Sequence, residues 1–284
     1  MSQQTYAELI RSGALKLREA GLESAAGDAR RLMLLATEFS SAALISTEND
    51  KAADNHRVRF EAFVQRRANR VPFAHISGWA EFYGLSLRSD QRALIPRPDS
   101  ETVVELALEL IPTETPWQIA DLGTGSGALL AAMLHERSHT RGYAVEASPQ
   151  ALSLAAENFE TLGVADRVQT FLGSWRDWPD WSACDLIISN PPYILSQVIA
   201  ELQPEVSRHD PLEALDGGTD GLDAYREIVA LGKDEMKAGA HLVLEIGYDQ
   251  KDAVSSLLLE YAFRDLQHRQ DLGGNDRAIA ATKS

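Results

Sequence analysis

Two short polar motifs, each directly after an apolar run, carry residue types that could perform chemistry. The first is the glycine-rich stretch Asp121-Leu122-Gly123-Thr124-Gly125-Ser126-Gly127, and the second is Asn190-Pro191-Pro192-Tyr193. Glycine permits sharp turns and lets a backbone approach a ligand closely. Proline fixes φ, lacks an N–H donor and holds the preceding residue extended. The first motif, called here the glycine turn, predicts a ligand cradle. The second, called the proline turn, predicts a rigid turn with free carbonyl acceptors.

The glycine turn by itself fits two kinds of cofactor. Gly123, Gly125 and Ala128 satisfy the fingerprint of nicotinamide dinucleotide sites. Asp121, however, would repel a pyrophosphate, whereas it would stabilise the cationic amino group of S-adenosylmethionine. Glu146, at the end of the next predicted strand, is spaced to accept hydrogen bonds from a ribose. We therefore expect S-adenosylmethionine. The cofactor-binding residues expected from the sequence are Asp121, Gly123, Thr124, Gly125, Ser126, Gly127 and Glu146.

The proline turn suits a planar NH₂ group that is a poor nucleophile. An amide nitrogen shares its lone pair with its carbonyl, so its N–H groups need acceptors that orient it during attack. The side-chain oxygen of Asn190 and the carbonyl of Pro191 could accept these two hydrogen bonds. Tyr193 could pack against the flat group. With the methyl group already activated by a sulfonium, in-line positioning is the main task left for the protein. We expect Asn190, Pro191, Pro192 and Tyr193 to be catalytic and substrate-binding.

The surrounding pattern predicts an α/β domain that could hold these motifs. From residue 117 onward, strand-like and helix-like runs alternate, and the chain ends in two strand-like runs around Gly273-Gly274. This order predicts a Rossmann-like, doubly wound sheet with an antiparallel final strand. Parallel strands present their carboxyl ends at one edge, where such folds bind ligands. We expect the methyl-transfer domain to span residues 96–284.

The N-terminal part has a different character. Residues 3–70 show apolar side chains at helical spacing in three segments, and the pattern ends at Val71-Pro72. The next stretch is aromatic, β-branched and punctuated by Gly78 and Gly84, which predicts a β-hairpin. We expect a small all-α domain over residues 1–72 and a hairpin linker over residues 73–95.

Composition limits the functional class. The 284 residues carry a formal net charge of −15, which opposes binding to a phosphate backbone and favours a basic protein partner. One cysteine, Cys184, allows no intramolecular disulfide. The chain begins without a signal-like segment and has no apolar run long enough for a membrane span. We expect a cytoplasmic protein, a monomer with no membrane partner, and no metal, since His75, His209 and His241 lack ligand spacing.

Together the motifs resemble those of the class I S-adenosylmethionine methyltransferases and, more narrowly, of the release factor glutamine N5-methyltransferases of the HemK/PrmC type. The resemblance covers most of the chain. It is carried by residues 95–101 (IPRPDSE), the glycine turn, the proline turn, residues 210–222, residues 244–247 and residues 271–277. Ser174 departs from the family pattern, because many relatives have an acidic residue there. Asp99 and Ser100 replace a commoner Glu-Thr.

This resemblance implies roles beyond those expected from the residues. The glycine turn would wrap the methionine end of the cofactor, Trp175 would lie on the adenine, and Asn190 would touch both cofactor and substrate. The substrate implied is the glutamine of the Gly-Gly-Gln motif in peptide chain release factors, with the helical domain helping to dock that protein.

Other interpretations stay open. An adenine N6-methyltransferase of nucleic acid shares the Asn-Pro-Pro-Tyr motif, a glutamine of another protein such as a ribosomal protein could be the acceptor, and the chain could be a non-enzymatic binding module. Arg97 and Glu101 could line the site or form an ion pair at a helix start. Glu245 could be functional or only satisfy a neighbour. Asp216 and Asp220 are expected in a capping loop, and Trp178 and Trp181 in core or rim packing.

Overall fold

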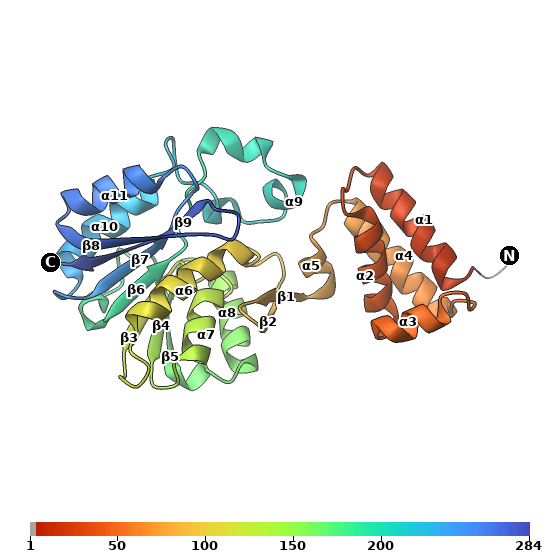
Figure 1. The fold of residues 1–284 in the computed structure, drawn as a ribbon, viewed down its shortest axis with the longest axis horizontal. Helices are drawn as coiled ribbons and strands as arrows, with labels where there is room; N and C mark the ends of the chain where they lie inside the picture. Colours follow the sequence, from red (N-terminus) through yellow and green to blue (C-terminus); the bar gives the residue numbers. More distant parts are fainter. Residues whose placement is uncertain (1–3) are drawn as a thin grey trace. The chain divides into compact units, whose positions relative to one another are not determined.

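A computed structural model describes residues 4–284, and these residues divide into two compact units. The first unit ends at Gly78 and the second begins at Trp79. Each has its own hydrophobic core. Figure 1 shows the first unit as helical and the second as a sheet covered by helices. Within residues 4–284, no helix is long and apolar enough to cross a membrane.

The first unit is built from five helices within residues 4–78. They are α1 (Tyr6–Glu19), α2 (Ala25–Thr37), α3 (Ser41–Thr47), α4 (Asp54–Ala68) and α5 (Phe73–Ser77). The three predicted helical segments are confirmed as α1, α2 and α4; α3 and α5 are additional and too short to show a clear period. Thr5 and Glu8 form a capping box that starts α1. Gly13 lets α1 approach α4 closely, because a Cβ there would lie 2.6 Å from the Phe60 ring.

A two-stranded hairpin opens the second unit. Strands β1 (Trp79–Phe82) and β2 (Leu85–Arg88) pair antiparallel around Tyr83-Gly84, both with positive φ, as a tight hairpin turn requires. The hairpin is as predicted, but the expected linker over residues 73–95 is not a single element. Its first part is helix α5, in the first unit. The hairpin itself belongs to the second unit, because Phe82 and Leu87 are buried in the core that underlies the main sheet.

The main sheet has seven strands within the described part of the chain. They are β3 (Gln118–Leu122), β4 (Arg141–Glu146), β5 (Val168–Leu172), β6 (Leu186–Ser189), β7 (His241–Glu245), β8 (Phe263–Gln270) and β9 (Asp276–Lys283). Their order is β5-β4-β3-β6-β7-β9-β8, with β3 to β7 parallel and β9 antiparallel to both neighbours. The predicted doubly wound sheet with an antiparallel finish is confirmed.

Helices cover both faces of this sheet (Figure 1). The helices are α6 (Glu101–Leu110), α7 (Ala128–Glu136), α8 (Pro149–Thr161), α10 (Asp223–Glu235) and α11 (Lys251–Glu260). Successive residues of a strand point to opposite faces of the sheet. Ile188 packs in the core with α6, α7 and α8, whereas Ile187 packs in the core with α10 and α11. This period of two explains why the central strands read as nearly continuous apolar runs. Short turns complete the chain: η1 (Pro98–Ser100), η2 (Ala165–Arg167), η3 (Trp181–Ala183), η4 (Ser196–Glu201), α9 (Pro204–Ser207) and η5 (Leu212–Ala214).

The register between β3 and β6 brings the two sequence motifs together. Leu122 of β3 is the partner of Ser189 of β6, and the strands are parallel. The glycine turn and the proline turn therefore leave neighbouring strands at the same level and the same edge. The sheet order also reverses here, since β4 and β5 extend one side of β3 and β6 lies on the other. Ligand sites in such folds form at this switch point.

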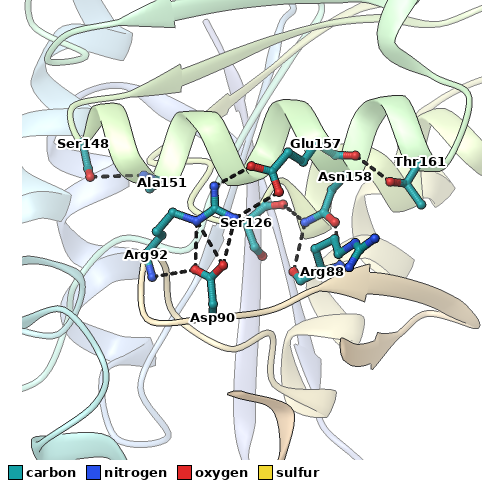
Figure 2. Close-up of polar contacts among 9 residues, drawn as sticks. All are labelled: Arg88, Asp90, Arg92, Ser126, Ser148, Ala151, Glu157, Asn158 and Thr161. Carbon is teal, nitrogen blue, oxygen red and sulfur yellow. Dashed lines mark hydrogen bonds and ion pairs between the residues drawn. The ribbon is translucent and has the colours of Figure 1, made fainter. Parts of the chain in front are cut away.

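A buried amide fastens the end of the hairpin to helix α8, as Figure 2 shows. The Oδ1 of Asn158 accepts from the backbone N–H of Arg88 at 2.6 Å, and its Nδ2 donates to the carbonyls of Arg88 at 3.2 Å and Ser126 at 2.8 Å. Farther along, Arg92 pairs with Asp90 and, at 2.5 Å, with Glu157. Asn158 thus ties the hairpin, α8 and the glycine turn to one another.

We predict that Asn158→Ala lowers the free energy of unfolding of the second unit by about 3 kcal/mol, because one buried and two partly buried backbone groups lose their partner. The measurement is urea unfolding followed by tryptophan fluorescence, which reports the second unit alone since all five tryptophans lie beyond residue 78. Glu157→Ala is the control, with an expected loss under about 1 kcal/mol because its ion pair is half exposed. Equal losses in the two variants would contradict the assignment.

Candidate active site

A cavity of about 700 Å³ lies at the carboxyl edge of the sheet, entirely within the second unit. The loops after β3, β4, β5 and β6 line it, together with residues 92–96 and 211–214. Eight of the sequence-predicted site residues form part of its wall: Gly123, Thr124, Gly125, Ser126, Glu146, Asn190, Pro191 and Pro192. Trp175, for which the family resemblance implied an adenine contact, also lines it. Asp121, Gly127 and Tyr193 are not among the lining residues.

The glycine turn presents bare backbone to the cavity. Gly123, Gly125 and Gly127 have φ values of 71°, 56° and 81°, a region that other residues rarely adopt. The N–H groups of Gly123 and Thr124 donate to the Val145 carbonyl of β4, at 2.8 and 3.1 Å, which fixes the turn against the neighbouring strand. Gly127 faces helix α8 instead, because a Cβ there would lie 2.8 Å from the Phe159 ring. The first part of the turn is thus a cradle and Gly127 is a packing position.

Asp121 is a buried carboxylate beneath the glycine turn. It is 1 % exposed, and its Oδ2 accepts from the Thr124 hydroxyl at 2.6 Å. Its other oxygen, Oδ1, has no hydrogen-bond partner within residues 4–284. Burial raises the pKa of Asp121 to about 7; the Thr124 hydrogen bond opposes the rise and the Glu146 carboxylate adds to it. An unsatisfied buried carboxylate needs positive charge nearby. This fits a ligand whose amino group is bound at the turn.

Glu146 ends β4 with its carboxylate held in place. Its Oε2 accepts from the backbone N–H of Gly125 at 2.9 Å, and its Oε1 from that of Ser148 at 2.9 Å. Each carboxylate oxygen has a second lone pair, and Glu146 lines the cavity. The side chain can therefore accept two more hydrogen bonds, as a vicinal diol such as that of a ribose would donate.

Trp175 has its ring fixed by a residue that the sequence did not indicate. Its Nε1 donates to Oε1 of Glu227 on α10 at 2.6 Å, and a Cβ on Gly123 would lie 3.5 Å from its ring. The same Glu227 binds Arg176. Trp175 and Glu227 both line the cavity, so a flat apolar face stands next to the glycine turn. Ser174, the departure from the family pattern, lines it as well.

The charge of the cavity wall favours a cationic ligand. Glu146, Glu213 and Glu227 line it. Among the described lining residues the arginines are Arg92 and Arg176, and each is already paired with carboxylates. A pyrophosphate would meet net negative charge with no available cation, whereas a sulfonium and an amino group would be stabilised. The dinucleotide alternative is therefore disfavoured, and the residues present fit S-adenosylmethionine.

The proline turn carries free acceptors at the cavity. The Nδ2 of Asn190 lies 3.5 Å from the Ser100 hydroxyl oxygen, whereas its Oδ1 accepts no hydrogen bond from any described residue. The carbonyl of Pro191 likewise has no partner within residues 4–284. Asn190, Pro191 and Ser100 all line the cavity. The two acceptors proposed for a substrate NH₂ group are thus present and available.

Tyr193 does not line the cavity and has its own polar partners. Its hydroxyl donates to Oε1 of Glu245 at 3.1 Å, and Nη1 of Arg277 lies 3.5 Å from the same hydroxyl. Burial and the Glu245 carboxylate raise the pKa of Tyr193, so the phenol stays neutral. The expected packing of this ring against a substrate remains a prediction. In this structure Tyr193 connects the proline turn to the end of β7.

A glycine-rich segment braces the proline turn from behind. A Cβ on Gly217 would lie 2.7 Å from the Tyr193 Cα, and one on Gly221 would lie 2.5 Å from the Tyr193 carbonyl oxygen. That carbonyl accepts from Nε2 of Gln250 at 3.1 Å. The sequence pointed to the glycines only through the family resemblance, and nothing in the sequence distinguished Gln250. Asp216 and Asp220 hold this segment by binding Ser196 and Arg226.

The remaining candidates have separate partners. Arg97 pairs with the buried Asp210 at 2.7 Å, and Glu101 accepts from the Tyr83 backbone N–H at 2.8 Å, so the two do not pair with each other. Trp178 and Trp181 are buried core residues, as expected. Residues 4–284 contain no group of three or more His, Cys, Asp or Glu side chains that could hold a metal ion.

Comparison with known proteins identifies similar families and relatives. Residues 8–78 match the family described as PrmC N-terminal domain, and residues 99–203 match the methyltransferase small domain. Release factor glutamine methyltransferase of Bradyrhizobium diazoefficiens is 41% identical over 99% of this chain and 95% of its own length. The proteins of the same name from Cereibacter sphaeroides and Caulobacter vibrioides are 39% and 34% identical, covering 97% and 95% of this chain and 97% and 93% of theirs. The solved hMettl16 catalytic domain, in complex with the MAT2A 3'UTR hairpin 6, shares the fold, with a TM-score of 0.57 at 15% identity over 81% of this chain and 82% of that one.

We predict that Asp121→Asn changes two quantities in opposite directions: the ligand-free fold becomes more stable at neutral pH, and S-adenosylmethionine binds more weakly. The raised pKa means that the folded protein binds this proton more tightly than the unfolded chain, so its stabilising contribution is full at low pH and is lost as pH rises toward 7. Without ligand, the free energy of unfolding of the variant, relative to that of the wild type, should increase by about 2 kcal/mol from pH 5 to pH 8. At pH 8 its Kd for S-adenosylmethionine should rise about tenfold. Calorimetry and denaturant unfolding measure the two effects, and a variant with unchanged affinity would contradict the assignment.

We predict that Gly217→Ala slows methyl transfer about 100-fold, because the added methyl group must displace the proline turn, and small displacements of reacting groups are costly. The Kd for S-adenosylmethionine should change little, since Gly217 does not line the cavity. Gly27→Ala is the matched control: it lies in α2 with no atom within 4 Å of the new methyl group and should keep the wild-type rate. A wild-type rate in Gly217→Ala would show that the brace is unimportant.

Proposed function

The chain belongs to the family of release factor glutamine methyltransferases, and we propose that it methylates the side-chain amide nitrogen, N5, of a glutamine in peptide chain release factors. It is an S-adenosylmethionine-dependent methyltransferase. The glutamine proposed is that of the Gly-Gly-Gln motif. The observation that carries the proposal is the pair of free acceptors, Asn190 Oδ1 and the Pro191 carbonyl, beside the glycine turn on the neighbouring strand.

The chemistry required of the protein is mainly orientation. When bound, S-adenosylmethionine supplies an electrophilic methyl group. Asn190 and Pro191 accept the two N–H groups of the substrate amide and so aim its nitrogen at the glycine turn. Acceptance of these hydrogen bonds also stabilises the positive charge that grows on nitrogen during attack. The nitrogen is acidic once methylated and loses a proton readily, so the proposal assigns no strong general base.

Charge supports a protein substrate in preference to nucleic acid. The second unit carries 16 basic and 33 acidic residues, whereas the first carries 11 and 9. The unit with the cavity would repel a phosphate backbone and attract a basic protein loop. We assign the first unit, which matches the PrmC N-terminal domain, to docking of the release factor. We also propose that the enzyme acts as a monomer in the cytoplasm, where release factors work.

The test is mass spectrometry of a release factor incubated with S-adenosylmethionine and the enzyme. We expect one added methyl group on the Gly-Gly-Gln peptide, and Asn190→Ala should reduce kcat at least about 100-fold while it largely preserves cofactor binding. Glu105→Ala, on the exposed face of α6, serves as a control with wild-type activity.

Parallel reactions with DNA, RNA and ribosomal proteins measure the competing activities. Methyl transfer to one of these, with the release factor peptide left unmodified by folded, cofactor-bound enzyme, would refute the proposed substrate. Cofactor binding with no transfer to any of them would make the chain a binding module.

A further inference from the structure

The order of the strands matches the order of the parts of S-adenosylmethionine. Asp121 is near the end of β3, Glu146 ends β4 and Trp175 follows β5, and these strands are neighbours in the sheet. A carboxylate beneath the glycine turn suits the amino group, Glu146 suits the ribose diol, and a flat indole suits a purine by stacking. Asn190 follows β6, on the other side of β3. This order gives the base of the cofactor the same neighbour, Trp175, that the family resemblance implied.

The indole of Trp175 is held from three directions. Its backbone carbonyl accepts from Nε1 of the buried Trp181 at 3.0 Å. A Cβ on Gly123 would lie 3.5 Å from Cζ3 of the ring, so the ring lies close to the glycine turn. Its Nε1 donates to Oε1 of Glu227 at 2.6 Å. An indole has a single N–H and no acceptor, so this bond uses the whole hydrogen-bonding capacity of the ring. Glu227 is therefore the partner that gives the ring a direction.

Glu227 is itself held on both sides. It lies on α10, where the next residues, Ile228 and Val229, are completely buried in the core. Its carboxylate forms a two-point ion pair with Arg176, in which Nε donates to Oε1 and Nη2 donates to Oε2 at 2.5 Å. The Arg176 side chain is 66 % exposed, whereas that of Glu227 is 21 % exposed. The charge of Glu227 is thus balanced, and its effect on a ligand is exerted through the direction of the Trp175 ring.

We propose that Glu227 is a positioning residue for cofactor binding, which holds the Trp175 ring in the orientation that receives the base of S-adenosylmethionine. Without this hydrogen bond the indole can turn about its side-chain torsions, and the binding free energy must then supply the cost of ordering it. The inference goes beyond the proposed function, because it requires binding of the cofactor and no particular methyl acceptor.

The first experiment compares the Kd for S-adenosylmethionine of the wild type, Glu227→Ala and Glu227→Gln by calorimetry. Alanine removes the acceptor, so the Kd should rise about tenfold, the order of magnitude for ordering one large side chain. Glutamine keeps an oxygen that accepts from the indole, and the exposed Arg176 can move aside, so its Kd should stay within about threefold of the wild type. Equal weakening in both variants would make charge the cause, and a wild-type Kd in Glu227→Ala would show no role; either result overturns the proposal.

The matched control is Glu235→Ala, which removes an exposed glutamate at the end of the same helix. It should keep the wild-type Kd. Urea unfolding followed by tryptophan fluorescence checks that each variant folds. A weakening in Glu235→Ala as large as that in Glu227→Ala would show a general effect of the charge of α10 and contradict the positioning role.

A second comparison uses ligands that differ in charge. S-adenosylmethionine carries a positive sulfonium, S-adenosylhomocysteine has the same nucleoside with a neutral sulfur, and 5′-methylthioadenosine lacks the amino-acid part. A misplaced ring affects any ligand that contains the base, so Glu227→Ala should weaken all three by about the same factor. Asp121→Asn should leave 5′-methylthioadenosine nearly unaffected, because this ligand has no amino-acid ammonium group. A Glu227→Ala loss confined to S-adenosylmethionine would show an electrostatic effect and contradict the proposal.

Trp175→Phe tests whether Glu227 acts through this ring. Phenylalanine keeps an aromatic face but has no N–H, so we expect a Kd close to that of Glu227→Ala. The double variant Trp175→Phe/Glu227→Ala should bind about as tightly as either single variant, because both remove the same hydrogen bond. Losses that multiply would show that Glu227 acts independently of Trp175 and would refute the positioning role.

The indole N–H of Trp175 gives a readout without cofactor or activity. Its ¹⁵N–¹H signal, assigned by its loss in Trp175→Phe, should exchange slowly with water in the wild type and in Glu227→Gln, and at least about tenfold faster in Glu227→Ala. An unchanged exchange rate in Glu227→Ala overturns the proposal. If the enzyme leaves release factors unmodified while the Kd values and the exchange rates follow these expectations, the substrate proposal fails and the positioning role stands.

Discussion

The parallel pairing of β3 with β6 is the constraint on which the site depends. Leu122 lies opposite Ser189, so the two strands release their loops at the same level, and the Ser189 hydroxyl donates to the Leu122 carbonyl at 2.7 Å. A shift of one residue would turn alternate side chains to the other face of the sheet and bury the wrong set. Since all of β6 and every residue of β3 after Gln118 are buried, the core fixes this register. The glycine turn and the acceptors of the proline turn therefore lie close together as a consequence of core packing.

The second unit also contains buried carboxyl groups, and burial opposes their ionisation. Asp121 lies beneath the glycine turn and Glu245 beside Tyr193, and burial raises the pKa of both. Each costs stability in the folded, ligand-free protein at neutral pH. Such groups persist where a charge has a use. Asp121 accepts from the Thr124 hydroxyl of the glycine turn at 2.6 Å, and Glu245 accepts from the Tyr193 hydroxyl of the proline turn at 3.1 Å.

Much of the fold and part of the site were predictable from the sequence, because they depend on local patterns. Alternating apolar runs gave the sheet and its antiparallel finish, and the glycines and prolines marked the two turns. Short helices such as α3 and α5 span too few residues to show a period. Contacts of high sequence separation were not predictable: Gln250 reaches the Tyr193 carbonyl across 57 residues, and Glu227 reaches Trp175 across 52. The direction of the Tyr193 hydroxyl likewise depends on a residue of another strand.

A crystal structure of the enzyme with S-adenosylhomocysteine and a Gly-Gly-Gln peptide would test the central claim most directly. The account predicts that the glutamine side-chain nitrogen donates to Asn190 Oδ1 and to the Pro191 carbonyl, with the cofactor sulfur in line beyond it at the glycine turn. A complex in which the proline turn faces solvent, or in which the sulfur lies far from Asn190, would contradict it.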